Sequence, residues 1–121
     1  MIPKEEKKMR ITDIILTAEQ ICGNSEGQAL LLGTTEGFEY ADGKKTDNHT
    51  HNKAESVFHM NRYEKATVKV MNTKQVITNE QIAQQGGSVK VKFKNLSGRF
   101  YRTASGEYEL SCKADGMEVI A

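Results

Sequence analysis

The chain has 121 residues, of which 37% are hydrophobic and 27% charged, and it contains no tryptophan. This length and composition indicate one soluble globular domain over residues 1–121, with a core built mainly from aliphatic side chains. No apolar run approaches the roughly 20 residues that a membrane-spanning helix needs, and residues 1–10 are charged rather than signal-like. The sequence therefore favours a cytoplasmic location.

The start of the chain predicts a disordered leader followed by short elements. Residues 1–8 carry mixed charges and a proline, so we expect them to be disordered. Residues 9–16 are rich in isoleucine and predict a first strand. Residues 17–20 have the Thr-x-x-Gln pattern that can begin a helical turn.

An Asp-Gly pair at residues 42–43 predicts a tight hairpin turn. The segment before it contains an apolar run at residues 28–32 and an extended stretch at residues 37–40. Residues 45–54 are polar and show no periodicity, so we expect a long mobile loop there. Residues 56–60 are expected to form the next strand.

The clearest pattern lies between residues 65 and 94. Residues 65–71 and 89–94 alternate between apolar and basic or polar side chains, as strands with one buried face do. Between them, Thr78 and Gln81 form a capping box ahead of a Gly-Gly pair, which predicts a short helix over residues 78–85. A strand, a short helix and a strand in a strand-rich chain indicate a small all-β barrel.

A last half-buried strand is expected at residues 107–114, where apolar and polar side chains again alternate. The two cysteines have neither zinc-site nor redox-motif spacing, and we expect both to be reduced and structural. The alternation assigns Lys69, Lys90 and Lys92 to an exposed face. The predicted core side chains are Val68, Val70, Val89, Val91, Phe93, Tyr108, Leu110 and Cys112.

The formal net charge of +1 hides a segregation of charge along the chain. Residues 61–106 carry nine Lys or Arg against two Glu, a balance of +7, so the remainder carries −6. Segregation of this kind is typical of a basic binding face on a nearly neutral protein. The alternative is that lysine-rich strand faces are simply solvated and discourage edge pairing.

His49 and His51, with Asp47 and His59 nearby, form the one metal-like cluster of the sequence. Histidines two residues apart in an extended segment can face the same way, and imidazole is a common zinc ligand. The spacing lacks the paired ligands of an established zinc site, so we expect a polar loop and neither a metal nor a cofactor. No nucleophile elbow, phosphate loop or zinc-protease motif is present, and we do not expect an enzyme.

Basic and aromatic residues are interleaved between Ser88 and Arg102, without an acidic residue. Phosphates need cations along a track, and unpaired bases need flat rings or guanidinium planes to stack on. Tyr101, between two arginine neighbours, is the preferred stacking residue, and the lysine stripe would hold the backbone. The candidate nucleic-acid-binding residues are Lys69, Lys90, Lys92, Lys94, Arg99, Tyr101, Arg102, Phe38, Tyr40 and Lys44.

Four segments of the chain follow one another in a recognisable order: Thr67-Val68-Lys69-Val70, a short helix, Val89-Lys90-Val91-Lys92-Phe93, and Tyr108-Glu109-Leu110 before Ala114-Asp115-Gly116-Met117. In this order the chain resembles the OB-fold single-stranded DNA-binding proteins of phages and conjugative elements. The resemblance covers roughly residues 56–120 and looks strongest toward the small helicase-processivity and replication-accessory proteins of integrative conjugative elements. It implies a five-stranded Greek-key barrel that binds through one face.

The expected function is therefore non-catalytic, largely sequence-independent binding of single-stranded DNA in phage or mobile-element replication or transfer. The resemblance implies a helicase or another replication protein as partner. The competing interpretation is a protein–protein interaction module of a phage or mobile element that assembles through an exposed edge strand. The sequence leaves open the oligomeric state, a homodimer included, and the choice between DNA and RNA.

Overall fold

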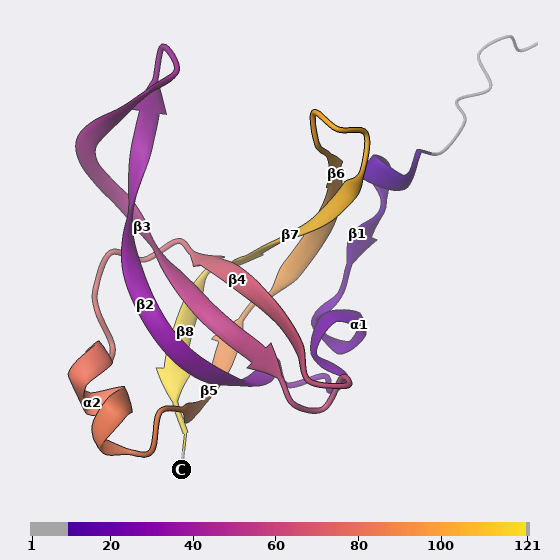
Figure 1. The fold of residues 1–121 in the computed structure, drawn as a ribbon. Helices are drawn as coiled ribbons and strands as arrows, with labels where there is room; N and C mark the ends of the chain where they lie inside the picture. Colours follow the sequence, from indigo (N-terminus) through magenta and orange to yellow (C-terminus); the bar gives the residue numbers. More distant parts are fainter. Residues whose placement is uncertain (1–9, 121) are drawn as a thin grey trace, which may run out of the picture.

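A computed structural model describes residues 10–120 as one strongly curved sheet with short helices beside it (Figure 1). The leader expected at residues 1–8 lies outside the described residues. In chain order the elements are η1 (Ile11–Asp13), β1 (Ile15–Leu16), α1 (Ala18–Cys22), β2 (Gln28–Ala41), β3 (Lys44–Phe58), β4 (Glu64–Val70), α2 (Asn79–Gln84), β5 (Val89–Lys94), β6 (Ser97–Arg102), β7 (Tyr108–Ala114) and β8 (Gly116–Val119).

The eight described strands form a single sheet in the order β1-β6-β7-β4-β3-β2-β5-β8. The all-β class expected from the sequence is confirmed. β2, β3 and β4 are an antiparallel meander, whereas β4 and β7 run parallel, with Val68 opposite Cys112. No helix in the described part of the chain is long and apolar enough to cross a membrane.

The structure differs from the expected five-stranded Greek-key barrel, since the described sheet has eight strands and no ladder between β1 and β8 closes it. The difference has a local cause. β5–β6 and β7–β8 are one long antiparallel hairpin that keeps the same register on both sides of a bend. The bend lies at Asn95, whose φ is 52° and whose side-chain amide donates to Asp115 Oδ2 over 2.8 Å. The bend divides the two long strands of this hairpin into β5, β6, β7 and β8. With β1 as a further strand, the five expected strands become eight.

Both α-helices begin with the capping boxes that the sequence predicts. At α2 the Thr78 hydroxyl accepts from the Gln81 amide over 3.1 Å, and Gln81 Oε1 accepts from the Thr78 amide over 2.9 Å. Thr17 and Gln20 repeat this arrangement at α1. The predicted helix at residues 78–85 and the helical turn at residues 17–20 are therefore confirmed.

β2 and β3 extend past the rest of the sheet as a two-stranded hairpin, here called the arm (residues 37–51; Figure 1). Its turn has the positive φ values of a tight hairpin, 54° at Asp42 and 77° at Gly43, as predicted. The prediction of a loop at residues 45–54 was wrong, because all of these residues belong to β3. Alternation is absent there because most side chains on both faces of the arm are exposed or half-buried.

The first strand is shorter than expected from residues 9–16, because the described part of that segment begins with η1 and pairs with β6 only at β1. The Arg10 amide donates to Asp13 Oδ2 over 3.2 Å, so local capping replaces extension. The strand expected at residues 56–60 ends at Phe58, where the turn to β4 starts.

The core fills the inside of the curved sheet and includes Ile21 of α1 and Ile82 of α2. Two predicted core residues differ: Tyr108 is 48% exposed and Leu110 only partly buried, because β7 continues beyond the core toward the β6–β7 turn (Figure 1). The predicted core residues that are buried are Val68, Val70, Val89, Val91, Phe93 and Cys112.

Candidate nucleic-acid interface

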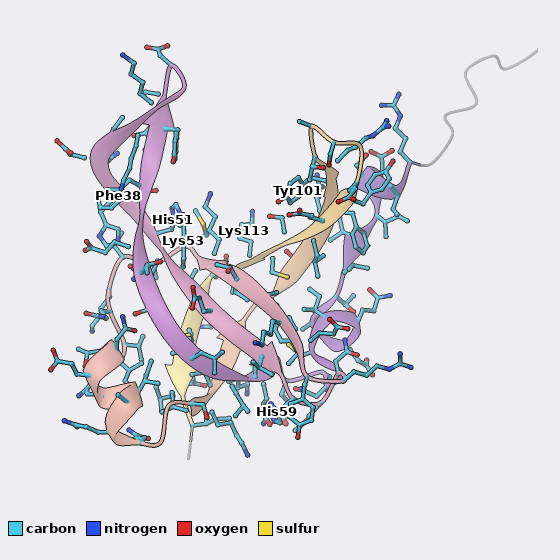
Figure 2. All side chains as sticks on the ribbon, in the orientation of Figure 1. Phe38, His51, Lys53, His59, Tyr101 and Lys113 are labelled. Atoms are coloured by element: carbon cyan, nitrogen blue, oxygen red, sulfur yellow. The ribbon has the colours of Figure 1, made fainter. Side chains whose placement is uncertain are left out.

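A groove of about 700 Å³ lies between the arm and the surface of β4 and β7. The labelled side chains of Phe38, His51 and Lys53 in Figure 2 mark the side of the groove that β2 and β3 form. Its lining includes two aromatic side chains of the arm, Phe38 and Tyr40, together with His51, Lys53 and Lys69. The groove therefore combines rings and cations on one surface.

Three lysines from adjacent strands form a row along this surface, here called the lysine row. Lys53 of β3 is opposite Lys69 of β4, and Lys69 is opposite Lys113 of β7. Neighbouring strands are about 4.8 Å apart, and like charges placed side by side at that spacing repel. Among residues 10–120, no Asp or Glu carboxylate lies within 4.0 Å of a lysine amine. An anion over the row would relieve this repulsion.

The strand register explains why the row faces outward. The adjoining positions Ala54, Val68 and Cys112 form the next row of opposed residues, and all three are buried in the core. Because successive side chains of a strand point to opposite faces, the lysines must lie on the outer face. Figure 2 shows His51, Lys53 and Lys113 together in the opening beside the arm.

Phe38 and His49 form an aromatic pair on the arm, with ring centroids 5.7 Å apart and an interplanar angle of 42°. Lys45 Nζ lies 4.6 Å from the Phe38 centroid, within the range of a cation–π contact. His49 is itself held by Asn52 Oδ1, 2.9 Å from Nε2, and by Glu36, whose carboxylate lies 3.6 Å from Nδ1. The arm thus presents a fixed ring at the edge of the groove.

His51 sits at the arm end of the groove and is more than nine-tenths buried. Its ring covers the α-carbon of the opposed Gly37 so closely that a β-carbon there would overlap it. Its Nδ1 is 2.8 Å from the Thr50 hydroxyl. Burial lowers the pKa of His51, and Lys69, Lys53 and His49 lower it further. The imidazole is therefore neutral at pH 7.

Tyr101 lies on the β6–β7 hairpin, apart from the arm (Figure 2), and is not among the residues that line the groove. Its hydroxyl donates to Glu109 Oε1 over 3.0 Å, and this bond raises the pKa of Tyr101. Arg99 is two residues away on the same side of β6, whereas Arg102 is on the other side. A base could stack on Tyr101 with Arg99 beside it, but the Glu109 carboxylate that accepts from Tyr101 places a negative charge at the same position.

The structure places the predicted lysine stripe of β5 away from the groove. Lys90 is opposite Leu30 of β2, and Lys92 is opposite Glu118 of β8. Lys92 and Lys94 border a different depression, of about 460 Å³. Lys44 lies at the tip of the arm, beside the turn. Of the predicted residues, Lys69, Phe38 and Tyr40 line the groove together.

No sequence pattern pointed to Lys53 or Lys113 as binding residues, and His51 was a candidate only as a weak metal ligand. Lys53 was hidden in the segment expected to be a loop. Lys113 was visible as an outward position of the alternating strand at residues 107–114. Only the parallel pairing of β4 with β7, which connects distant parts of the chain, brings Lys113 beside Lys69.

The histidines and cysteines outside the groove lie apart from one another or are buried without a ligand-like cluster in the described part of the chain. Within residues 10–120, no three His, Cys, Asp or Glu side chains are grouped as metal ligands. His59 lies at the opposite end of the sheet from the groove (Figure 2), and neither of its buried ring nitrogens has a hydrogen-bond partner among the described residues. Burial raises the pKa of Cys22 to about 12 and that of Cys112 to about 11, and both thiols are unbridged.

Comparisons with models of protein families, with curated proteins and with solved structures found no match. The groove and the lysine row are therefore the basis on which a function can be proposed.

Proposed function

We propose that this protein binds single-stranded DNA without catalysing a reaction and with little sequence preference. The sugar-phosphate backbone crosses the lysine row, and unpaired bases lie against the rings of the arm. One observation carries the proposal: three adjacent lysines without a carboxylate partner among the described residues, beside an open groove with aromatic walls. A basic groove with aromatic side chains is how proteins bind single strands without reading sequence.

The connectivity of the sheet supports an OB-like arrangement for this function. An OB fold is a partly open Greek-key barrel of five strands, which binds oligonucleotides through strands 2 and 3 and through the loops between strands 1 and 2 and between strands 4 and 5. If each bent strand of the long hairpin is taken as one, five strands follow α1, and α2 lies between the third and the fourth. The arm then takes the place of the first binding loop, and the β6–β7 turn that of the second.

The biological setting that we propose follows the resemblance described above. The protein would act as an accessory factor in the replication or transfer of phage or mobile-element DNA, together with a helicase or another replication protein. A lysine row that contacts only phosphates suits such a role, because an accessory factor has to accept any sequence that is unwound.

Salt dependence tests the proposal. We expect the affinity for a single-stranded oligonucleotide, measured by fluorescence anisotropy, to fall steeply with salt. Lys53→Gln, Lys69→Gln and Lys113→Gln should each weaken binding and flatten the slope of log K against log[salt] by about 0.7 per lost phosphate contact.

Lys90→Gln is the matched control, since it removes an equal charge outside the groove and should change binding little. If Lys90→Gln and Lys92→Gln reduced the slope instead, the site would lie on β5. No binding by the folded wild-type protein at low salt would remove the proposal.

One observation favours a second candidate, a protein-interaction module. β8 is an edge strand with no described neighbour beyond it, and Val119 on it is 39% exposed. An unpaired edge can accept a strand from a partner. Binding through backbone hydrogen bonds and apolar contacts would tolerate salt, so the same titration series separates the two functions.

A further inference from the structure

We propose that His51 is a proton-linked neighbour of a phosphate site: it is neutral while the groove is empty and takes up a proton when a phosphodiester lies across Lys53 and Lys69. This inference rests on the proposed function and adds a dependence on pH to the same site. It concerns a residue whose imidazole the sequence had suggested only as a weak metal ligand.

The geometry fixes the imidazole where a phosphate on the lysine row would be its neighbour. His51 and Lys53 are two residues apart on β3 and so face the same side of the sheet. Both line the groove with Lys69. The ring is seated on Gly37 and bonded to the Thr50 hydroxyl through Nδ1, so it has little freedom to turn away.

The charges around the ring come from four strands and are mostly positive. β3 contributes Lys53 and His49, β4 contributes Lys69, and β7 contributes Lys113 next along the row. β2 contributes two carboxylates, Glu36 and Glu39, of which Glu39 also lines the groove. Glu36 faces His49, and Glu39 accepts from the Asn48 amide over 2.7 Å. Tyr40 of β2 also lines the groove.

Binding of an anion in the groove would favour the protonated form of His51 instead of the neutral form. In the empty groove, burial and the neighbouring cations disfavour the charged imidazolium. A phosphodiester carries a full negative charge, and an opposite charge within about 4–6 Å favours the charged form of the ring. The proton affinity of His51 is then higher in the complex than in the unbound protein. By linkage, DNA binding takes up a proton, and affinity rises as pH falls between the unbound and bound pKa values.

The simplest alternative is that His51 only fills the space above Gly37. A structural role predicts no proton uptake on binding and no difference in pH dependence when the imidazole is replaced. A proton-linked role predicts both, so the two can be separated by measurements other than affinity alone.

The test is a titration of rhodamine-labelled oligothymidine between pH 5.5 and 8 at constant ionic strength. Neither the phosphodiester nor thymine titrates in this range, so changes belong to the protein. For the wild type we expect affinity to rise as pH falls, by up to about tenfold per pH unit, which is the limit for one proton. His51→Gln should flatten this dependence, and His59→Gln, far from the groove, should keep it.

A second measurement does not depend on any variant folding. The protein has three histidines, and NMR titration of their ring protons gives each pKa with and without oligothymidine. A rise of the His51 pKa on binding supports the proposal, and an unchanged value overturns it. An unaltered pH dependence in a folded His51→Gln protein also overturns it. Absence of DNA binding at every pH would instead remove the proposed function, so the two failures are distinguishable.

Discussion

Gly37 determines how closely the two strands of the arm approach at the inner end of the groove. The His51 ring occupies the space in which any other residue at this position would place its β-carbon. Glycine is used wherever a neighbouring group must approach the backbone this closely. The imidazole can lie beside the lysine row only because residue 37 is a glycine and has no side chain.

This contact predicts a specific coupling between the two residues. Gly37→Ala should destabilise the protein by about 1–3 kcal/mol through overpacking. The cost should largely disappear when His51 is also replaced by alanine, because the clashing ring is then gone. The four proteins of this double-mutant cycle can be compared by urea denaturation. If the effects of the two substitutions on the free energy of unfolding were additive, the His51 ring would not clash with the added β-carbon at residue 37 and the argument from close contact would be wrong.

At the scale of elements, the lysine row joins three strands that the core forces together. Ala54, Val68 and Cys112 are buried side by side in the core. Because successive side chains of a strand point to opposite faces, the lysines next to them must lie side by side on the outer face. The repulsion within the row is a cost of folding that the proposed binding of phosphates would offset. Stability and affinity should therefore respond in opposite directions to the loss of one charge.

Lys69→Gln tests this opposition, since Lys69 stands between the two other lysines. We expect the free energy of unfolding to rise by roughly 0.2–1 kcal/mol, the usual size of a cross-strand pair effect, while DNA affinity falls. The gain should shrink at high salt, where the repulsion is screened. Lys90→Gln, opposite an apolar residue, should leave both quantities nearly unchanged. A loss of stability in Lys69→Gln would contradict the argument.

The sequence was informative where the signal is local. The capping boxes at Thr17 and Thr78, the Asp-Gly turn and the alternation of β4, β5 and the second half of β7 are confirmed, because each depends on residues within a few positions of one another. The arm escaped prediction because its two faces are both largely solvated, which removes alternation. The lysine row escaped because its members belong to strands whose pairing no local pattern specifies.

At the scale of the whole molecule, one core supports both the sheet and the groove. Val91 is fully buried on the side of β5 away from Lys90. Its burial links the strands β2 and β8 on either side of β5 to the rest of the core. A single truncation here should therefore lower the stability of the entire domain without changing the surface proposed to bind DNA.

Val91→Ala is expected to cost about 1–3 kcal/mol, a large share of the 5–15 kcal/mol that typically stabilises a domain. Lys90→Ala should cost almost nothing. Thermal denaturation followed by circular dichroism measures both. DNA affinity well below the melting temperature should be the same in Val91→Ala as in the wild type. Equal costs for the two variants would show that the register of β5 is wrong.

The parallel ladder between β4 and β7 has a consequence for a chain that is still being synthesised. Lys53 and Lys69 come from adjacent strands of a meander, and they can meet as soon as β4 has left the ribosome. Lys113 joins them only after α2, β5 and β6 have followed and β7 has docked. Contacts between such distant segments form late, because a long loop must close first. A nascent chain therefore carries an incomplete lysine row until β7 has docked, and the proposed affinity for nucleic acid should be complete only from that point.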